Sequence, residues 1–178
     1  MASTFAPIFV GAIPVFADVD LNTFLIDPEE VKKKISHRTK AVISVSLYGL
    51  PPDLGELRRI CDTHGIALVE DNAQGIGGQY AGKNVGSYGD ISIYSFQRSK
   101  HLTTGDGGII TCDDEQLADS IRKLSCQGFR NATARSGKIR VSKDIFQDPD
   151  YKRHDIFGFM YRLPEVAAAM GLAQLSNA

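Results

Sequence analysis

The sequence predicts an α/β protein in which a mostly parallel, mixed sheet lies between two layers of helices. Short apolar, β-branched runs alternate along the chain with segments whose apolar residues recur at helical spacing, and this order favours a parallel sheet covered on both faces. Two of the apolar runs are separated by a loop short enough for an antiparallel pair, which makes the sheet mixed. The 178 residues suit one domain, large enough to bury roughly 70% of the surface of the unfolded chain.

Local signals define the elements of the first half of the chain. Asp27 is placed to cap a helix that has Pro28 at its first position and ends near Ser36. A second helix, residues 53–64, has four apolar residues on one face and is followed by Gly65, which suits the left-handed C′ position. The predicted strands are Ile13–Ala17, Lys40–Ser46 and Ile66–Glu70, and the apolar helix residues are Leu54, Leu57, Ile60 and Cys61.

The second half of the chain continues this alternation and then changes character. Strands are predicted at Asp90–Phe96 and Gly107–Cys112, and a helix follows from Asp113 to near Ser125. Residues 127–157 are polar and show little periodicity, so we expect a long mobile loop there. The last predicted element is an alanine-rich helix, Pro164–Leu175.

Composition and charge are ordinary for a soluble globular protein, with 43% hydrophobic and 23% charged residues. A net charge of −1 gives no reason to expect nucleic acid or an anionic membrane as partner. No apolar run is long enough to span a bilayer and no signal peptide is recognisable, so a cytoplasmic location is expected. The odd, widely spaced Cys61, Cys112 and Cys126 favour buried thiols over a disulfide framework or a metal site.

Two segments contain the residues most suited to chemistry. The polar loop within Ser95–Gly108 places Lys100 between two predicted strands, and Asp71 follows another strand directly. Ligands of open α/β sheets collect at the carboxyl ends of strands, so Asp71 lies where site chemistry is expected. A lysine near an acid and phosphate donors is a candidate for Schiff-base chemistry with an aldehyde cofactor. The glycines of residues 75–78 lack the spacing of a dinucleotide-binding loop and indicate a turn.

Five segments, in the correct order, resemble the DegT/DnrJ/EryC1/StrS family of sugar aminotransferases. These segments are Gly11-Ala-Ile-Pro-Val-Phe-Ala-Asp-Val-Asp20, Thr39–Gly49, Asp71-x-x-Gln74, Ser95-x4-Lys100 and Tyr161-Arg-Leu-Pro-Glu-x-x-Ala-Ala168. The resemblance implies the large domain of fold type I, the three-layer α/β/α fold of pyridoxal 5′-phosphate (PLP) enzymes. Family members are considerably longer, so residues 1–178 are expected to be the central part of that domain, without its N-terminal segment and the C-terminal small domain.

The resemblance also implies a role for each site residue. Lys100 would bind the PLP aldehyde as a Schiff base and act as general acid and base. Asp71 would pair with the pyridinium nitrogen, Gln74 would contact the ring near its phenolic oxygen, and Ser95 would hold the phosphate. Without the resemblance, Lys100 reads as a solvated loop lysine, and the other three read as turn-stabilising or strand-end residues. Glu70 should point to the other side of its strand and is interpreted as structural.

Three neighbouring positions qualify this assignment. A related dehydratase branch has histidine at the lysine position, but a count of five residues from Ser95 reaches Lys100 and not His101. Arg98 is interpreted as a solvated surface residue. At the family's Gly-x-Asn-Tyr-Arg segment this chain has Met160, and methionine cannot donate the bond that the asparagine makes to the cofactor phosphate of a partner subunit.

The predicted function is therefore transfer of an amino group, from glutamate or glutamine, to a keto-sugar that is nucleotide-linked or to an aminocyclitol-type substrate. Such a reaction belongs to amino-sugar, polysaccharide or antibiotic biosynthesis, and the resemblance implies a homodimer. Two alternatives stay open: a deoxysugar dehydratase of the same fold, and a catalytically silent fragment that serves as an interaction module. Neither nucleic acid, membrane nor metal is expected to bind.

Overall fold

The computed structural model describes residues 1–135 and 141–176 and consists of two units. The larger unit comprises Met1–Thr111 and Val166–Ala178, and the smaller comprises Cys112–Glu165. The larger unit contains the sheet and every sequence-predicted site residue. The predicted loop at residues 127–157 lies in the smaller unit, and its residues 136–140 lie outside the described part of the chain.

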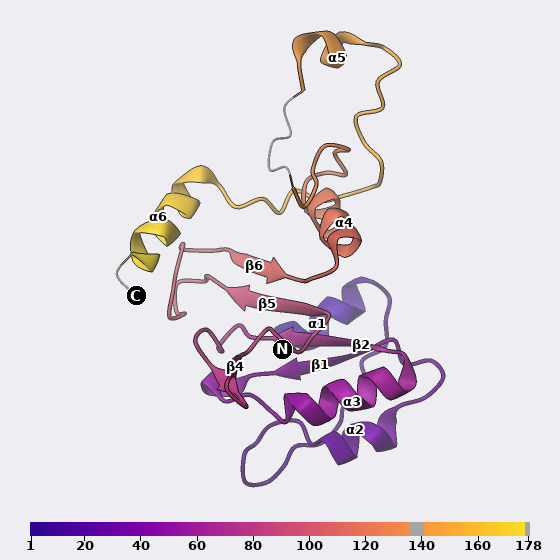
Figure 1. The fold of residues 1–178 in the computed structure, drawn as a ribbon, viewed down its shortest axis with the longest axis vertical. Helices are drawn as coiled ribbons and strands as arrows, with labels where there is room; N and C mark the ends of the chain where they lie inside the picture. The colour runs from indigo at the N-terminus through magenta and orange to yellow at the C-terminus, as the bar shows by residue number, and fades with distance from the viewer. Residues whose placement is uncertain (136–140, 177–178) are drawn as a thin grey trace. The chain divides into compact units, whose positions relative to one another are not determined.

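A four-stranded sheet forms the centre of the larger unit, in the order β1-β2-β5-β6 (Figure 1). β1 runs parallel to β2, β2 runs parallel to β5, and β6 pairs antiparallel with β5. The prediction of a mostly parallel, mixed sheet is therefore confirmed. The strands are β1 Ala41–Val45, β2 Ala67–Asp71, β5 Ile91–Ser95 and β6 Gly108–Thr111, and a separate hairpin joins β3 Gln79–Tyr80 to β4 Lys83–Asn84.

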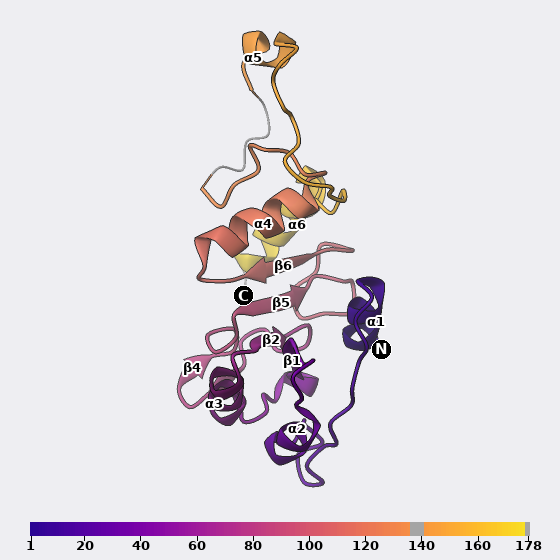
Figure 2. The ribbon, with the colours of Figure 1, turned by 90° about the vertical axis from the view of Figure 1, so that its right-hand side faces the viewer.

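Helices lie on both sides of this sheet. Figure 2 shows α3 and α1 on opposite sides of β1 and β2, with α2 beside α3, so that three layers are formed. The predicted helices in this unit are present, whereas α1 was not predicted. The bounds are α1 Ala2–Phe9, α2 Pro28–Lys34, the short 3-10 helix η1 Leu47–Gly49, α3 Leu54–His64 and α6 Glu165–Leu175.

The hydrophobic core lies between α3 and the sheet. Leu57, Ile60 and Cys61 of α3 pack with residues from β1, β2 and α2, which are Val42, Leu68 and Val31. Burial raises the pKa of the Cys61 thiol, which keeps it a neutral apolar side chain. The four predicted apolar residues of α3 are all buried, so the helical periodicity identified the correct face.

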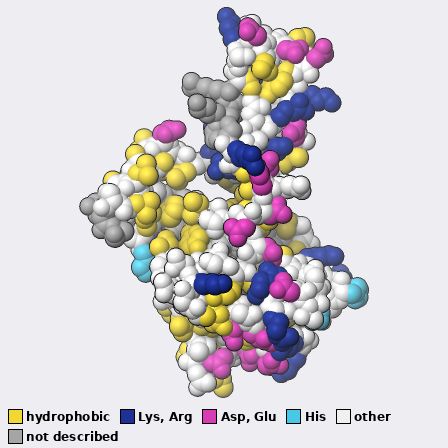
Figure 3. Space-filling model, in the orientation of Figure 1, with side chains coloured by type: hydrophobic (Ala, Val, Ile, Leu, Met, Phe, Trp, Pro, Cys, Tyr) yellow, Lys and Arg dark blue, Asp and Glu magenta, His cyan; other side chains and the backbone are white. Residues whose placement is uncertain are grey.

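Capping residues set the ends of α3. The Asp53 carboxylate accepts a hydrogen bond from the backbone N–H of Glu56, at 2.9 Å, and satisfies a donor of the first turn. At the other end Gly65 has a φ of 61°, the left-handed conformation predicted for it. The pKa of Glu56 is lowered to about 2, first by its hydrogen bonds with Arg59 and then by that with Lys32 of α2. Figure 3 shows charged side chains of both signs over this part of the surface.

A buried polar cluster lies under the carboxyl ends of the strands, on the side that faces α3. Asn72 donates to Ser92 Oγ at 2.8 Å, and Ser46 Oγ donates to Asn72 Oδ1 at 2.7 Å. The Glu70 carboxylate, fully buried, accepts the backbone N–H groups of Gly86, Tyr88 and Gly89 at 2.6, 2.9 and 2.6 Å. Glu70 therefore anchors the loop before β5.

One sequence prediction about secondary structure was wrong. Residues Ile13–Ala17 do not form a strand; they run without ladder partners, and the Ile13 side chain is 76% exposed. Pro14 lies inside this run and lacks the N–H that a central ladder position requires, so the apolar alternation there does not report a strand. The long loop predicted for residues 127–157 contains a short helix, α5 Lys143–Gln147, although the rest of its described residues are irregular.

In its described residues, 112–135 and 141–165, the smaller unit consists of two helices and paired irregular segments. Its longer helix, α4 Glu115–Ser125, is capped by the Asp114 carboxylate, which accepts from the Leu117 N–H at 2.8 Å. Asp155 binds both Lys123 and Arg130 at 2.9 Å, which ties the irregular segments to α4. Cys126 and Cys61 are buried and Cys112 is partly exposed, and none of these cysteines forms a disulfide.

Candidate active site

The topology brings the sequence-predicted site residues to one edge of the sheet. β2 and β5 are parallel and pair Asp71 with Ile93, so Asp71 and Ser95 lie at the carboxyl ends of neighbouring strands. Gln74 lies in the turn after β2, and Lys100 lies in the loop that connects β5 to β6. This edge is where open α/β sheets hold their ligands.

Asp71 is the buried acid of this edge. Its side chain is 6% exposed and lies on the sheet face opposite to Glu70, as strand alternation requires. The Ala73 N–H donates to Asp71 Oδ1 at 3.1 Å, and the Ser3 hydroxyl donates to Oδ2 at 2.6 Å. Each oxygen therefore has one donor and keeps lone pairs for a further one.

Gln74 has a defined orientation. Its Oε1 accepts the backbone N–H of Tyr48 at 2.8 Å, and this bond identifies the oxygen end of the amide. Within the described residues the Gln74 NH₂ group has no hydrogen-bond partner, so it is available to an acceptor at this edge. Tyr48 has a φ of 53° and an 88% exposed side chain, a left-handed conformation uncommon outside glycine.

Short backbone hydrogen bonds shape the lysine loop. The Lys100 N–H donates to the Gln97 carbonyl at 2.9 Å, while Phe96 closes the loop by donating to Gly107 O at 2.8 Å and accepting from Thr104 N–H at 2.9 Å. Lys100 is partly buried, and its amino group makes no ion pair or hydrogen bond with any residue that the structure describes. A lysine amine without a partner is suited to reaction with an aldehyde.

Ser95 and α6 support the same loop. Ser95 Oγ accepts the Gln97 N–H at 3.3 Å and retains its own hydrogen for donation. Gln174 of α6 binds the backbone of Thr103 twice, by accepting its N–H at 3.0 Å and by donating to its carbonyl. The loop is thus attached at both sides of Lys100.

Sequence reasoning missed Ser3, Tyr48 and Gln174. The 68 positions between Ser3 and Asp71, and the 71 between Thr103 and Gln174, leave no local signal in the sequence. Tyr48 lies within Thr39–Gly49, a segment that resembles the family as a whole, and a tyrosine does not by itself indicate a left-handed backbone. His101 and Arg98, by contrast, are exposed, in line with the solvated interpretation of Arg98.

Met160, the departure from the family segment, belongs to the smaller unit. Its backbone forms an antiparallel bridge with Cys126, and its side chain is 51% exposed. Phe159 stacks on Tyr161 with ring centroids 5.3 Å apart. These contacts give the segment a structural role in its own unit.

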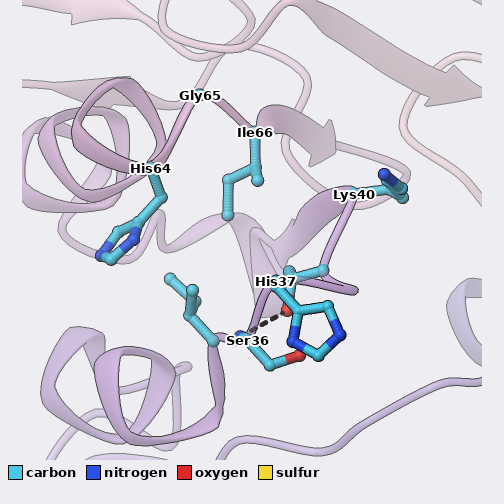
Figure 4. Close-up of a pocket in the computed structure, with 8 residues that line it drawn as sticks. Ser36, His37, Lys40, His64, Gly65 and Ile66 are labelled. Atoms are coloured by element: carbon cyan, nitrogen blue, oxygen red, sulfur yellow. Dashed lines mark hydrogen bonds between the residues drawn. The ribbon is translucent and has the colours of Figure 1, made fainter.

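A surface hollow at the opposite ends of β1 and β2 is lined by Ile35, Ser36, His37, Thr39, Lys40, His64, Gly65 and Ile66. Figure 4 shows the Lys40 amine and the His37 ring directed away from Ile66, so the basic groups do not converge. Among the described residues no group of three or more His, Cys, Asp or Glu is placed to hold a metal ion. No helix in the described part of the chain has the length and apolarity needed to cross a membrane.

The chain is similar in sequence to known aminotransferases. The model of the DegT/DnrJ/EryC1/StrS aminotransferase family matches residues 1–178. GDP-perosamine synthase from Vibrio cholerae is 36% identical over 167 residues, which are 94% of this chain and 41% of that protein. The chain thus spans less than half the length of this relative.

Two solved structures are similar to this chain over nearly its whole length. The aminotransferase from Psychrobacter cryohalolentis superimposes with a TM-score of 0.87 at 33% identity, covering 99% of this chain and 43% of that one. NtdA from Bacillus subtilis, solved with bound cofactor PMP, has a TM-score of 0.79 at 29% identity and covers 97% of this chain and 35% of that one.

Proposed function

Because the chain belongs to the DegT/DnrJ/EryC1/StrS aminotransferase family, we propose that the whole protein is a PLP-dependent aminotransferase acting on a sugar. The observation that supports this most directly is that a buried carboxylate, Asp71, ends one strand of the sheet, and a lysine amine with no partner among the described residues, that of Lys100, lies in the loop after the neighbouring strand. Lys100 would hold the cofactor aldehyde, and Asp71 would face its ring nitrogen. The chain would then contribute the central part of the PLP-binding domain.

The residues at this edge fit PLP by the chemistry of their free donors and acceptors. Asp71 is a buried acceptor with lone pairs remaining, which suits a protonated ring nitrogen. The free NH₂ of Gln74 suits the phenolic oxygen, and the hydroxyl hydrogen of Ser95 suits a phosphate oxygen. PLP, when bound, supplies an aldehyde and an electron-accepting ring.

The protein's own residues would then carry three tasks. Lys100 moves a proton at the substrate carbon, as a base while neutral and as an acid once protonated. Asp71 holds the proton on the ring nitrogen through a charge-assisted hydrogen bond. Gln174 and Thr103 keep the lysine loop attached to α6, so that the amine returns to the same place after each step.

The names of relatives support a nucleotide-linked sugar as acceptor. GDP-perosamine synthases from three organisms match this chain at 34–36% identity, and a solved relative, DesI, is described with its TDP-sugar product. We propose a nucleotide-linked keto-sugar as substrate, glutamate or glutamine as amino donor, and a homodimer as the assembly. An aminocyclitol-type ketone is the close variant of this substrate.

Purified protein incubated with PLP tests this proposal. We expect a visible absorbance band for lysine-bound PLP that is absent in Lys100→Ala and retained in the neighbouring control His101→Ala. A wild-type protein that stays colourless with excess PLP would contradict the proposal and favour the interaction-module alternative. If PLP binds, amino donors are then screened with nucleotide-linked keto-sugars. Release of a dehydrated sugar without consumption of an amino donor would favour the dehydratase alternative.

A further inference from the structure

The N-terminal helix α1 reaches the candidate site through one polar side chain. Ser3 lies in its first turn and donates to Asp71 Oδ2 at 2.6 Å, a contact between residues 68 positions apart. The length is that of a strong hydrogen bond from a hydroxyl to a carboxylate. Ser3 was not identified in the sequence.

The residues of α1 are largely exposed. None of its residues is buried, and Phe5, Ile8 and Phe9 are 55%, 49% and 88% exposed. The adjacent Thr4 hydroxyl makes no hydrogen bond to another residue in the described chain. The contact with Asp71 therefore distinguishes Ser3 from Thr4, and packing of the helix alone does not explain this contact.

The contact acts on the orientation of Asp71. The Ala73 N–H holds Oδ1 and the Ser3 hydroxyl holds Oδ2, so the two donors together fix the plane of the carboxylate. With the backbone donor alone, the carboxylate could still rotate about its Cβ–Cγ bond. A defined plane determines the direction in which the remaining lone pairs point.

We propose that Ser3 is a positioning residue that holds the Asp71 carboxylate in the orientation needed by the cofactor's ring nitrogen. This inference rests on the proposed PLP-dependent function and adds a residue to it. Ser3 acts through Asp71 and does not itself touch the cofactor. Its loss should therefore weaken PLP binding only when Asp71 is present.

Equilibrium titration of the PLP-free protein with PLP tests this, with the dissociation constant as readout. We expect Ser3→Ala to bind PLP about tenfold more weakly, since a hydrogen bond to a charged group is lost. Ser3→Thr retains the hydroxyl and should bind within about twofold of wild type, as should the control Thr4→Ala. Thermal unfolding of each PLP-free variant reports whether α1 or the sheet has been damaged.

A double-mutant cycle separates positioning from a general structural role. In an Asp71→Asn background, which keeps the shape of the side chain, Ser3→Ala should weaken PLP binding by less than about twofold. Equal binding by Ser3→Ala and wild type, or equal losses in both backgrounds, would overturn the role of Ser3 and leave the proposed function intact. Failure of wild type to bind PLP would overturn both.

Discussion

Removing the charge of Glu70 tests whether the buried polar cluster holds the carboxyl edge of the sheet together. Glu70 Oε1 accepts the N–H groups of Tyr88 and Gly89, and Oε2 accepts that of Gly86 and the Asn72 amide. In Glu70→Gln one carboxylate oxygen becomes an NH₂ group. Whichever way the amide is turned, two donors then face another donor.

The magnitude follows from these contacts. A buried donor left without an acceptor costs about 1–3 kcal/mol, and two are created. Part of this cost is offset because the neutral amide is easier to bury than a carboxylate. We therefore expect Glu70→Gln to lower the free energy of unfolding by about 3 kcal/mol.

Urea denaturation measures this change. With an m value of about 2 kcal/mol per molar urea, a loss of about 3 kcal/mol lowers the midpoint by about 1.5 M. Far-UV circular dichroism and tyrosine fluorescence should give coincident transitions, which shows that one cooperative unit is followed. The exposed Glu165→Gln is the matched control and should leave the midpoint nearly unchanged. A midpoint for Glu70→Gln equal to that of the control would refute the reasoning.

Three further changes test other parts of the fold. Leu57→Ala empties a fully buried core position and should cost about 3 kcal/mol in the same urea assay; a loss below about 1 kcal/mol would contradict the core assignment. Gly65→Ala should cost only about 1 kcal/mol, from the left-handed φ, because an added Cβ meets no atom within 4 Å, whereas Gly128→Ala would drive its Cβ into the Ile156 carbonyl and should cost more. For Asp90, burial acts to raise the pKa, but hydrogen bonds from Arg58 and a backbone N–H outweigh it and the pKa is lowered. The stabilising contribution of the ionised Asp90 side chain is present above the pKa that it has in the unfolded chain, and it is lost as the pH falls through its lower pKa in the folded protein. Wild type should therefore be about 1 kcal/mol more stable than Asp90→Asn at neutral pH, and this difference should close in acid. A difference that is independent of pH would contradict this.

Most of the fold could be predicted because its signals are local. Asp27 and Gly65 mark helix ends by their chemistry, and the spacing of the apolar residues in α3 identifies the buried face. The failure at Ile13–Ala17 has the same origin: apolar alternation was read as a strand although Pro14 cannot donate to a ladder. α1 was missed because it is short, has no capping side chain at its start and contains Pro7, which disfavours a helix interior.

The site was predictable to a lesser degree. The edge of the sheet and the loop could be inferred from strand ends and spacing, and the structure places Asp71, Gln74, Ser95 and Lys100 there. The residues that contact this edge from distant parts of the sequence could not be inferred. Ser3 and Gln174 act across about 70 positions of sequence, and only the folded chain brings them to Asp71 and Thr103.

The neighbouring acids Glu70 and Asp71 of β2 differ in the hydrogen-bond donors that their carboxylates meet. Because side chains alternate along β2, the two acids face opposite sides of the sheet. Glu70 meets backbone N–H groups that occupy both of its oxygens and so acts as an anchor. Asp71 meets a single donor at each oxygen and retains acceptor capacity. The difference in unused acceptor capacity is what separates Asp71, the residue proposed to bind the cofactor, from Glu70, although burial is similar for both.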